Sequence, residues 1–359
     1  MNDYILQVEN LKTYFKLDTG TLKAVDDVTF YLKRNETIGI IGESGCGKSV
    51  TAHSILRTVQ NPGKVLGGRI LYDDGSGPVD LVTCSPDSKA MRKLRGKDIS
   101  MIFQEPMASL SPVYTIGAQM MEAVLVHQEK KDKKAAKELC MEMLRAVGMP
   151  DPEQKYNAYP HQMSGGQCQR AMIAIAMVNK PKILIADEPT TALDVTVQAQ
   201  ITDLMKHFQK EFNMSIIYIT HDMGVIAEMA DTIAVMYLGR VVESGSARAI
   251  FKNPIHPYTK GLLKSMPVLG NKSSERLHAI EGNVPVPLDP PDECGFCSRC
   301  QEKTAACAGS IPPLVEVEPD HLVRCFHYQG NRGCPGQRNG GKDAESIVGD
   351  NWAEEILSD

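Results

Sequence analysis

The chain has 359 residues, of which 42% are apolar and 23% charged, and it carries a net charge of −5 at pH 7. This length and composition predict a globular protein that buries one large core and carries an appendage. The acidic balance and the lack of a long basic run argue against nucleic acid as the main partner.

The start of the sequence lacks the features of a secretory signal. The first ten residues have neither a basic start nor a long apolar stretch, so we expect a cytoplasmic protein. The most apolar runs, at residues 171–178, 183–186 and 233–238, are far shorter than the ~20 residues that span a bilayer. We therefore expect any attachment to a membrane to pass through a partner.

A glycine-rich turn lies between a predicted strand and a predicted helix. From residue 37 the sequence reads TIGIIGESGCGKSV, an apolar strand, a turn, and a helix that begins near Lys48. Residues 42–49 match the phosphate-binding Walker A pattern G-x-x-x-x-G-K-[ST] in the setting it requires. In such a loop Lys48 neutralises the β- and γ-phosphates and the Ser49 hydroxyl ligates Mg²⁺. The predicted contacts to ATP are Gly42, Ser44, Gly45, Cys46, Gly47, Lys48, Ser49 and Val50.

Two further predicted strands end in polar residues. Residues 182–187 lead into Glu188, and residues 215–220 lead into His221. Short apolar strands that alternate with helices predict a parallel sheet with functional residues at the strand ends. Acidic residues end many strands, but beside a phosphate loop we interpret Asp187 as a Mg²⁺ ligand through water and Glu188 as the residue that polarises the attacking water.

Other parts of the chain have different patterns. Between residues 119 and 148 the periodicity is helical, with apolar positions on one face and Gly148 as a C-terminal cap, which predicts a helical insertion. After about Phe251 the composition shifts to Pro, Gly and Cys. We interpret that region as a separate appendage that ends in a polar tail.

Three more short motifs complete a recognisable series. Residues 163–167 read MSGGQ ahead of a helix, residues 191–194 read TALD, and residues 220–222 read THD. Together with the phosphate loop, Gln104 at a strand end and ILIADE at residues 183–188, they resemble ABC ATPases, with Met163 in place of the usual Leu of the LSGGQ signature. The resemblance implies an α/β P-loop NTPase fold with a RecA-like parallel sheet core, an antiparallel β subdomain, a helical subdomain at about residues 105–165 and a Cys-rich C-terminal extension.

The resemblance also implies that two subunits share each nucleotide. The MSGGQ segment places a hydroxyl and bare backbone amides at a helix N-terminus, which makes a second anion site. In the family two subunits pack head to tail, and the signature of one closes over the γ-phosphate held by the other. The residues implied to act across this interface are Ser164, Gly165, Gly166, Gln167 and Asp194.

Further roles follow from the same resemblance. Gln104 would ligate Mg²⁺ and sense the γ-phosphate, and His221 would hold the water and Glu188 in place. A lone His after a strand is more often structural, but the THD setting favours the catalytic interpretation. Phe15 lies where the family stacks an aromatic ring on adenine, with the neighbouring Tyr14, or a simple packing role, as the alternatives.

Several segments look like the subgroup that serves oligopeptide, dipeptide and nickel importers. They are QEPMASLSPVYTIG at residues 104–117, NPIHPYTKGLLKSMP at residues 253–267 and IEGNVPVP from residue 280. The likeness implies an ATPase domain at residues 1–250, a C-terminal extension at residues 251–335 and a polar tail at residues 336–359. It implies as partners a second ABC ATPase subunit, with a related chain favoured over a copy, two transmembrane permease subunits, and indirectly an extracytoplasmic solute-binding protein.

Cysteines gather in the predicted extension. Six of the ten lie between residues 294 and 334, and in a reducing cytoplasm such a cluster more often binds metal than forms disulfides. In some members of the subgroup four such cysteines carry a 4Fe–4S cluster. The positions that follow the subgroup pattern are Cys294, Cys300, Cys307 and Cys325. Cys297 and Cys334 are additional; Cys297 completes a C-x₂-C-x₂-C run and is an alternative ligand, and zinc or free thiols are the other interpretations.

We therefore expect an ATPase at the cytoplasmic face of the cell membrane that drives import of peptides. Nickel or oligosaccharide uptake is the alternative, because specificity resides in other subunits. An ABC ATPase of DNA repair or translation would need long coiled-coil inserts or two ATPase domains, which this sequence lacks. A module that binds ATP without hydrolysing it is disfavoured by the intact Lys48, Asp187, Glu188 and His221.

Overall fold

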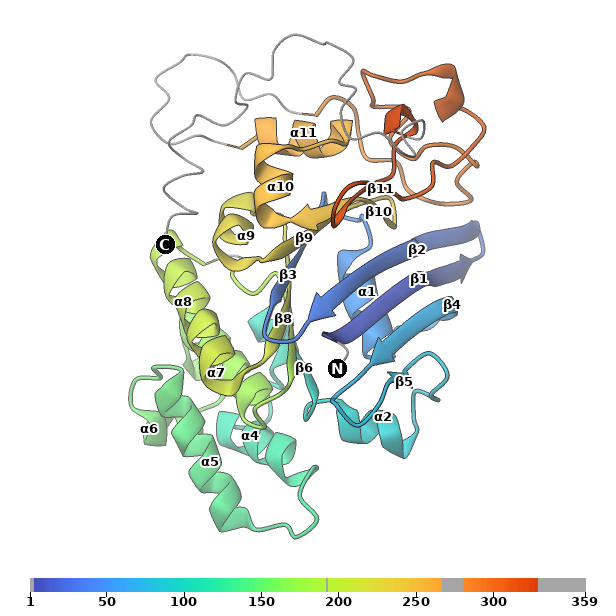
Figure 1. Ribbon diagram of the computed structural model, residues 1–359. Helices are drawn as coiled ribbons and strands as arrows, with labels where there is room; N and C mark the ends of the chain where they lie inside the picture. Colours follow the sequence, from blue (N-terminus) through green and yellow to red (C-terminus); the bar gives the residue numbers. More distant parts are fainter. Residues whose placement is uncertain (1–2, 192, 267–279, 329–359) are drawn as a thin grey trace, which may run out of the picture.

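The computed structural model describes residues 3–191, 193–266 and 280–328. Figure 1 shows two β-sheets side by side, a group of helices at one end of the molecule and the C-terminal extension at the other. The predicted tail at residues 336–359 and Cys334 lie outside the described residues.

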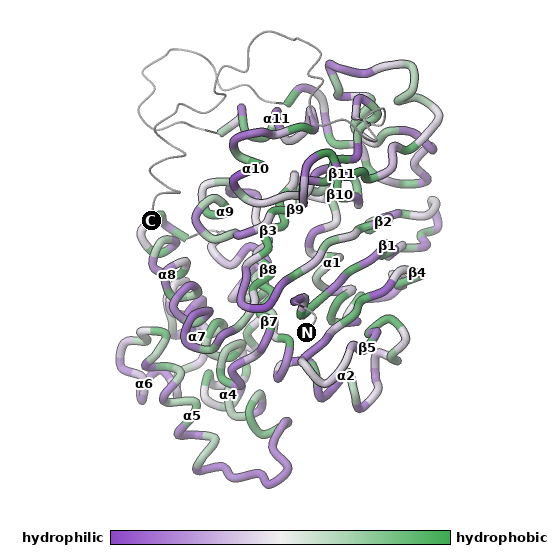
Figure 2. The backbone as a smooth tube through the Cα atoms, in the orientation of Figure 1, coloured by the Kyte–Doolittle hydropathy of each residue, from purple (hydrophilic) through white to green (hydrophobic). Residues whose placement is uncertain are grey.

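The larger sheet has eight strands in the order β11-β12-β10-β9-β3-β8-β7-β6. Its parallel part consists of β9 (Thr232–Tyr237), β3 (Thr37–Ile41), β8 (Ser215–Thr220), β7 (Ile183–Asp187) and β6 (Ile99–Ile102). Every residue of β3, β7 and β8 is buried, as in parallel sheets that are covered on both faces. Figure 2 shows the same hydrophobic strands at the centre of the molecule. The predicted parallel core is confirmed, and its carboxyl ends meet at one edge.

Helices cover this sheet and connect its strands. They are α1 (Lys48–Ile55), α8 (Val195–Phe212), α9 (Met223–Met229), α10 (Ala247–Lys252) and α11 (Pro257–Lys264). The helix predicted to begin near Lys48 begins at that residue. The predicted domain boundary at residue 250 falls inside α10.

The second sheet is antiparallel, in the order β2-β1-β4-β5. Its strands are β2 (Gly20–Lys33), β1 (Tyr4–Leu17), β4 (Gly63–Tyr72) and β5 (Val79–Asp80), and the short helix α2 (Lys89–Leu94) follows it. Alternate apolar residues of β1 and β2 are buried in one cluster with Ile38 and Ile40 of β3, so the two sheets share a core. The antiparallel subdomain is confirmed.

The predicted helical insertion is present between β6 and β7. It contains α3 (Pro106–Ser109), α4 (Ile116–Leu125), α5 (Lys133–Ala146), α6 (Pro152–Tyr156), a 3-10 turn (Pro160–Gln162) and α7 (Gly165–Met177). One face of α5 is buried through Ala136, Cys140 and Leu144. Gly148 has a φ of 68° two residues after that helix, the left-handed conformation that ends helices.

The C-terminal extension returns to the larger sheet instead of standing apart from it. β12 (His321–Val323) pairs with β10 (Arg240–Ser246), and β11 (Val315–Glu318) pairs with β12. The remaining 3-10 turns are Ala305–Cys307 and Phe326–Tyr328. The extension therefore adds two antiparallel strands to this edge of the larger sheet.

A buried carboxylate fixes this return. Glu243 of β10 is fully buried, and it accepts hydrogen bonds from the backbone N–H groups of Ile255 (2.7 Å) and His256 (2.9 Å) and contacts His321 Nε2 at 2.8 Å. A buried charge is tolerated only when it is paired and hydrogen-bonded. Glu243 thus ties β10, the start of α11 and β12 together.

Candidate nucleotide site

The phosphate loop, residues 42–49, connects β3 to α1. Gly42, Gly45 and Gly47 have φ values of 154°, 80° and 101°, in the region that favours glycine. A Cβ would come within 2.2 Å of the Met236 carbonyl oxygen at Gly42 and of the Ala24 carbonyl oxygen at Gly47. The loop is therefore packed between neighbouring backbones, which fixes its shape.

The lysine of the loop is held in place by the loop itself. Lys48 is 5% exposed, and its Nζ donates to the carbonyl oxygens of Gly42 at 2.7 Å and Glu43 at 3.2 Å. The thiol of Cys46 is buried, and burial raises its pKa. Cys46 can therefore offer a nucleotide only its backbone.

The carboxyl end of β7 brings an acid to the start of α1. Asp187 is 3% exposed, its pKa is raised by burial and by the charge of Glu188, and a hydrogen bond from Ser49 opposes that rise. Its Oδ1 is buried without a hydrogen-bond partner among the described residues. A hydroxyl and an unpaired carboxylate oxygen are the oxygen donors that Mg²⁺ prefers, so the residues fit that ion.

The predicted catalytic residues converge on Glu188. Its Oε2 accepts hydrogen bonds from Gln104 Nε2 at 3.1 Å and from Thr191 Oγ1 at 3.0 Å, and its Oε1 lies 3.4 Å from His221 Nδ1. Glu188 has a φ of 46°, a strained conformation for a residue with a side chain. Because its N–H donates to the Ile219 carbonyl oxygen at 2.8 Å, β8 holds this conformation.

A pocket of about 460 Å³ connects the phosphate loop with the antiparallel sheet. The residues that line it are Phe15, Leu22, Ala24, Ser44, Gly45, Gly47, Lys48, Ser49, Val50, Gln104, Glu188 and residues 284–287. Of the predicted contacts in the phosphate loop, Gly42 and Cys46 are not part of this lining. The participation of residues 284–287 was not predicted, because no local pattern indicates which distant segment a proline-rich loop will meet.

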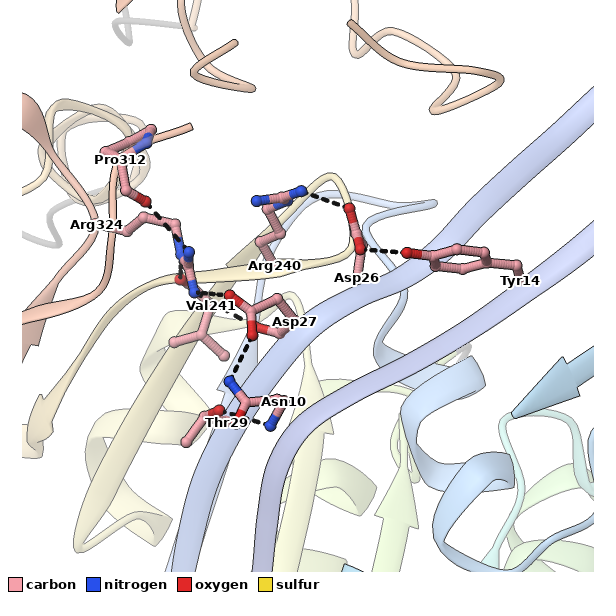
Figure 3. A network of polar contacts seen from close by, with 9 residues as sticks. All are labelled: Asn10, Tyr14, Asp26, Asp27, Thr29, Arg240, Val241, Pro312 and Arg324. Carbon is pink, nitrogen blue, oxygen red and sulfur yellow. Dashed lines mark hydrogen bonds and ion pairs between the residues drawn. The ribbon is translucent and has the colours of Figure 1, made fainter. Parts of the chain in front are cut away.

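Phe15 and Tyr14, the two candidates for the adenine-stacking ring, have different surroundings. Phe15 is half-buried and lines the pocket. Tyr14 donates its hydroxyl to Asp26 Oδ1 at 2.6 Å, within a network that also holds Arg240 and, through Asp27, Arg324 of the extension (Figure 3). The geometry favours Phe15 as the residue that meets a base.

The signature motif lies away from this pocket. Ser164 caps α7: its Oγ accepts the Gln167 N–H at 3.4 Å, and its own N–H donates to Gln167 Oε1 at 3.2 Å. Ser164 and Gly165 are exposed, and a Cβ at Gly165 would meet no described atom within 4 Å. Asp194 caps α8 by accepting the Val197 N–H at 2.9 Å. None of these residues lines the pocket, so one chain does not bring both anion sites together.

The cysteines of the extension lie close together but do not form a ready metal site. The Cys294 N–H donates to the Cys307 carbonyl oxygen at 3.0 Å, and burial raises the pKa of Cys294 to about 11. Among residues 3–191, 193–266 and 280–328, no group of three or more His, Cys, Asp or Glu side chains is arranged to hold a metal ion. Among the described cysteines, the ligands of the expected 4Fe–4S or zinc site are therefore not assembled.

Comparison with known proteins agrees with the geometry. Residues 25–191 match the ABC transporter family model, and residues 242–307 match that of the oligopeptide/dipeptide transporter C-terminal region. The chain is 46% identical to the oligopeptide transport ATP-binding protein AppD of Bacillus subtilis over 326 residues, which cover 90% of this chain and 97% of the relative. It is 44% identical to the dipeptide transport ATP-binding protein DppD of Haemophilus influenzae over 336 residues, 94% and 99% of the two chains. The chain belongs to the ABC transporter ATPases, in their oligopeptide and dipeptide group.

Solved ABC ATPases share the core of the fold. A dimeric structure of the ATP-binding cassette MJ0796 with ADP and Pi matches with a TM-score of 0.60 at 25% identity, and covers 68% of this chain and 99% of its own. The cbiO1 protein of Clostridium perfringens matches with a TM-score of 0.57 at 30% identity, and covers 70% of this chain and 91% of its own. Because these proteins are covered almost completely, this ABC ATPase contains their cassette and additional residues.

Within the part of the chain that the structure describes, we find no helix long and apolar enough to cross a membrane.

Proposed function

We propose that this ABC ATPase is one of two nucleotide-binding subunits that power a peptide importer from the cytoplasmic face of the membrane. The observation that carries the proposal is the convergence of Gln104, Thr191 and His221 on Glu188, beside a phosphate loop, in a chain whose signature motif faces outward. The residues around Glu188 would act on the nucleotide bound by this chain. The signature motif would contact a nucleotide bound by another subunit.

The residues divide the work of hydrolysis. Lys48 and the loop amides would hold the phosphates, and Ser49 and Asp187 would hold Mg²⁺, which supplies charge neutralisation at the β- and γ-phosphates. Glu188 would orient the attacking water, with Gln104 and His221 fixing the carboxylate. Positioning and electrostatics are the main contributions that a phosphoryl-transfer enzyme makes.

The second subunit would complete the site. Ser164, Gly165 and Gly166 lie at the N-terminus of the 13-residue helix α7, whose free N–H groups favour an anion. Since they are absent from the chain's own pocket, they would close over the γ-phosphate held by the partner, with Gln167 and Asp194 at the same interface. A related chain as partner remains our preference over a second copy.

A groove between β6 and the helices α4 and α7 would receive the permease subunits. It has a volume of about 580 Å³ and is lined by Phe103, Ser111 and Tyr114, among others. Phe103 is 41% exposed and Tyr114 is 59% exposed, so large apolar side chains are left uncovered. A photo-crosslinker at Ser109 or Ser111 in the assembled transporter should label a transmembrane subunit. Labelling confined to other proteins contradicts this docking surface.

Peptide is the solute we propose, because the relatives AppD and DppD are named for oligopeptide and dipeptide transport. The test is uptake by the purified transporter in proteoliposomes with ATP inside, with peptides, nickel and an oligosaccharide compared. ATP-dependent uptake of peptide alone supports the proposal. Uptake of nickel or of the oligosaccharide, with no uptake of peptide, contradicts the peptide proposal and makes the chain the ATPase of a different kind of importer.

We also propose that the thiols of the extension bind a metal centre that assembles only when the metal is present. The support is the donor set. Burial raises the pKa of Cys294, Cys300 and Cys325, and charge on neighbouring cysteines, Cys307 among them, raises each further, so the four thiols lie near one another. A bound cation offsets the repulsion between thiolates and lowers the pKa values of the thiols. The free energy of metal binding can also order the ligands. Cys297 is the alternative ligand.

Metal analysis after anaerobic purification separates the alternatives. A 4Fe–4S cluster gives a brown protein with iron and sulfide at about four per chain. One zinc per chain without colour assigns a tetrahedral site. Metal-free protein with titratable thiols contradicts both metal sites.

A further inference from the structure

The outer wall of the nucleotide pocket comes from the C-terminal extension. Residues 284–287, with the sequence VPVP, line the pocket together with Phe15 and Leu22 of the antiparallel sheet and Lys48 of the phosphate loop. The lining therefore joins segments more than two hundred residues apart in the sequence. We call residues 284–289 the strap.

The strap is fastened at one end to the β1–β2 hairpin. The Lys23 N–H donates to the Pro287 carbonyl oxygen at 3.0 Å, and the Asp289 N–H donates to the Thr21 carbonyl oxygen at 2.9 Å. The Asp289 Oδ1 accepts the Thr21 N–H at 3.1 Å. Figure 1 shows the extension beside the turn of this hairpin.

A glycine at the hairpin turn makes this fastening possible. Gly20 has a φ of 142°, and a Cβ built on it would lie 2.1 Å from Asp289 Oδ2. A side chain at this position would meet both an unfavourable backbone conformation and the carboxylate of the strap. Gly20 does not line the pocket, so a substitution there leaves the side chains of the lining unchanged.

The chain just before the strap, at residues 280 and 281, is fastened to the phosphate loop through one arginine. Arg299 donates from Nη1 to Glu43 Oε2 at 2.7 Å and from Nη2 to Glu43 Oε1 at 3.1 Å, a bidentate pair with the second residue of the loop. Its Nε donates to the Glu281 carbonyl oxygen at 3.0 Å, and its Nη2 also donates to the Ile280 carbonyl oxygen at 3.2 Å. The side chain of Arg299 is 4% exposed, so these bonds are shielded from water.

Between these two fastenings the strap presents a stiff, apolar segment to the pocket. Val284 and Val286 each precede a proline, which restricts both to extended conformations, and the prolines fix their own φ. Val286 is 74% exposed, although it belongs to a pocket lining. A rigid apolar edge that lines the same pocket as a half-buried phenylalanine suits one face or edge of a planar heterocycle.

We propose that the strap is a nucleotide-binding element: Val284 and Val286 contact the base and ribose of the nucleotide opposite Phe15, while the phosphate loop holds the phosphates. The inference rests on the proposal that this pocket binds ATP. It makes the C-terminal extension part of the nucleotide site instead of a distant appendage. Its specific consequence is that the strap contributes to binding of nucleosides and contributes nothing to binding of bare phosphates.

Titration calorimetry with Mg·ADP and with Mg·pyrophosphate tests this consequence, because neither ligand is hydrolysed during the measurement. The double substitution Val284→Ser and Val286→Ser should weaken ADP binding about tenfold, since loss of apolar contacts of this size in a pocket has that order of effect. Pyrophosphate binding should be unchanged. Val79→Ser, at a valine that is 46% exposed on β5 and outside the pocket, is the matched control and should change neither affinity.

Gly20→Ala provides an independent test that leaves every lining residue intact. It should release the strap and cause the same ADP-specific loss. Unchanged or tighter ADP binding in both strap variants overturns the proposal, and so does an equal loss for pyrophosphate, which would mean that the phosphate loop itself was disturbed. If the unaltered chain binds pyrophosphate and ADP equally weakly, the assignment of the pocket to ATP fails, which is a different result.

Discussion

The phosphate loop and the C-terminal extension meet at one pocket but are stabilised by different interactions. The loop follows a strand in which every residue is buried, and its shape is fixed by close backbone contacts. The extension adds Tyr258 and Phe296 to the main core and has a small apolar cluster of its own at Ile255, Val323 and Cys325. Its other attachments are charged: Arg299 and Arg324 bind the rest of the chain, and Glu243 of β10 binds the extension. Truncation of a buried apolar side chain destabilises a protein in proportion to the volume that is removed. Removal of one partner of a buried ion pair leaves an unpaired charge, and its full desolvation cost then counts against stability.

The largest expected effect is on the phosphate side. Glu188→Gln should lower ATP hydrolysis about a thousandfold, because loss of a positioned general base has an effect of this order. Nucleotide affinity should be retained, since the phosphate loop does not depend on Glu188. The measurement is phosphate release beside nucleotide titration. Near-normal hydrolysis in the purified variant excludes Glu188 as the residue that orients the water.

On the extension side, Glu243→Gln should destabilise the protein by about 3 kcal/mol, because an amide cannot replace both acceptor oxygens of a buried carboxylate. The reason lies in its three donors, the N–H groups of Ile255 and His256 and the imidazole of His321. Urea denaturation measures the change. Glu318→Gln, at an exposed carboxylate on β11, is the control; an equal loss there would remove the distinction between the anchor and an ordinary surface charge.

A smaller effect depends on pH. Burial lowers the pKa of His256 to about 4, so the folded protein keeps this imidazole neutral where the unfolded chain, with a pKa near 6.5, takes up a proton. Stability from this residue is complete above pH 6.5 and is lost as the pH falls from there towards 4. The expected loss between pH 7 and pH 5 is about 2 kcal/mol.

The matched variant is His256→Asn, which keeps a side-chain acceptor for the Tyr258 N–H at the start of α11 but does not titrate. The loss of unfolding free energy between pH 7 and pH 5, measured from denaturation curves, should therefore be smaller for the variant than for the unaltered chain. An equal loss of unfolding free energy in the two proteins would show that His256 does not cause this pH dependence.

The phosphate loop could be predicted from the sequence, whereas the attachments of the extension could not. The phosphate loop, the acidic strand end at Asp187 and the helix starting at Lys48 are local patterns, and each is present where predicted. The strands β11 and β12 have four and three residues and too little apolar periodicity to indicate pairing. The contacts of Arg299 with Glu43, and of Asp289 with Thr21, join distant segments, which no spacing in one sequence reveals.

The separation of Ser164 from the chain's own pocket leads to the central claim, that two subunits share each nucleotide. The direct test is light scattering on the Glu188→Gln chain mixed with the second ATPase subunit of its transporter, with and without Mg·ATP. We predict that ATP converts single subunits into a particle of two. Adding Ser164→Arg to this chain, and the corresponding substitution to the signature motif of the second subunit, should prevent this association while each subunit still binds ATP. Particles that remain single with ATP bound, or that form equally well with Ser164→Arg, would contradict the shared site.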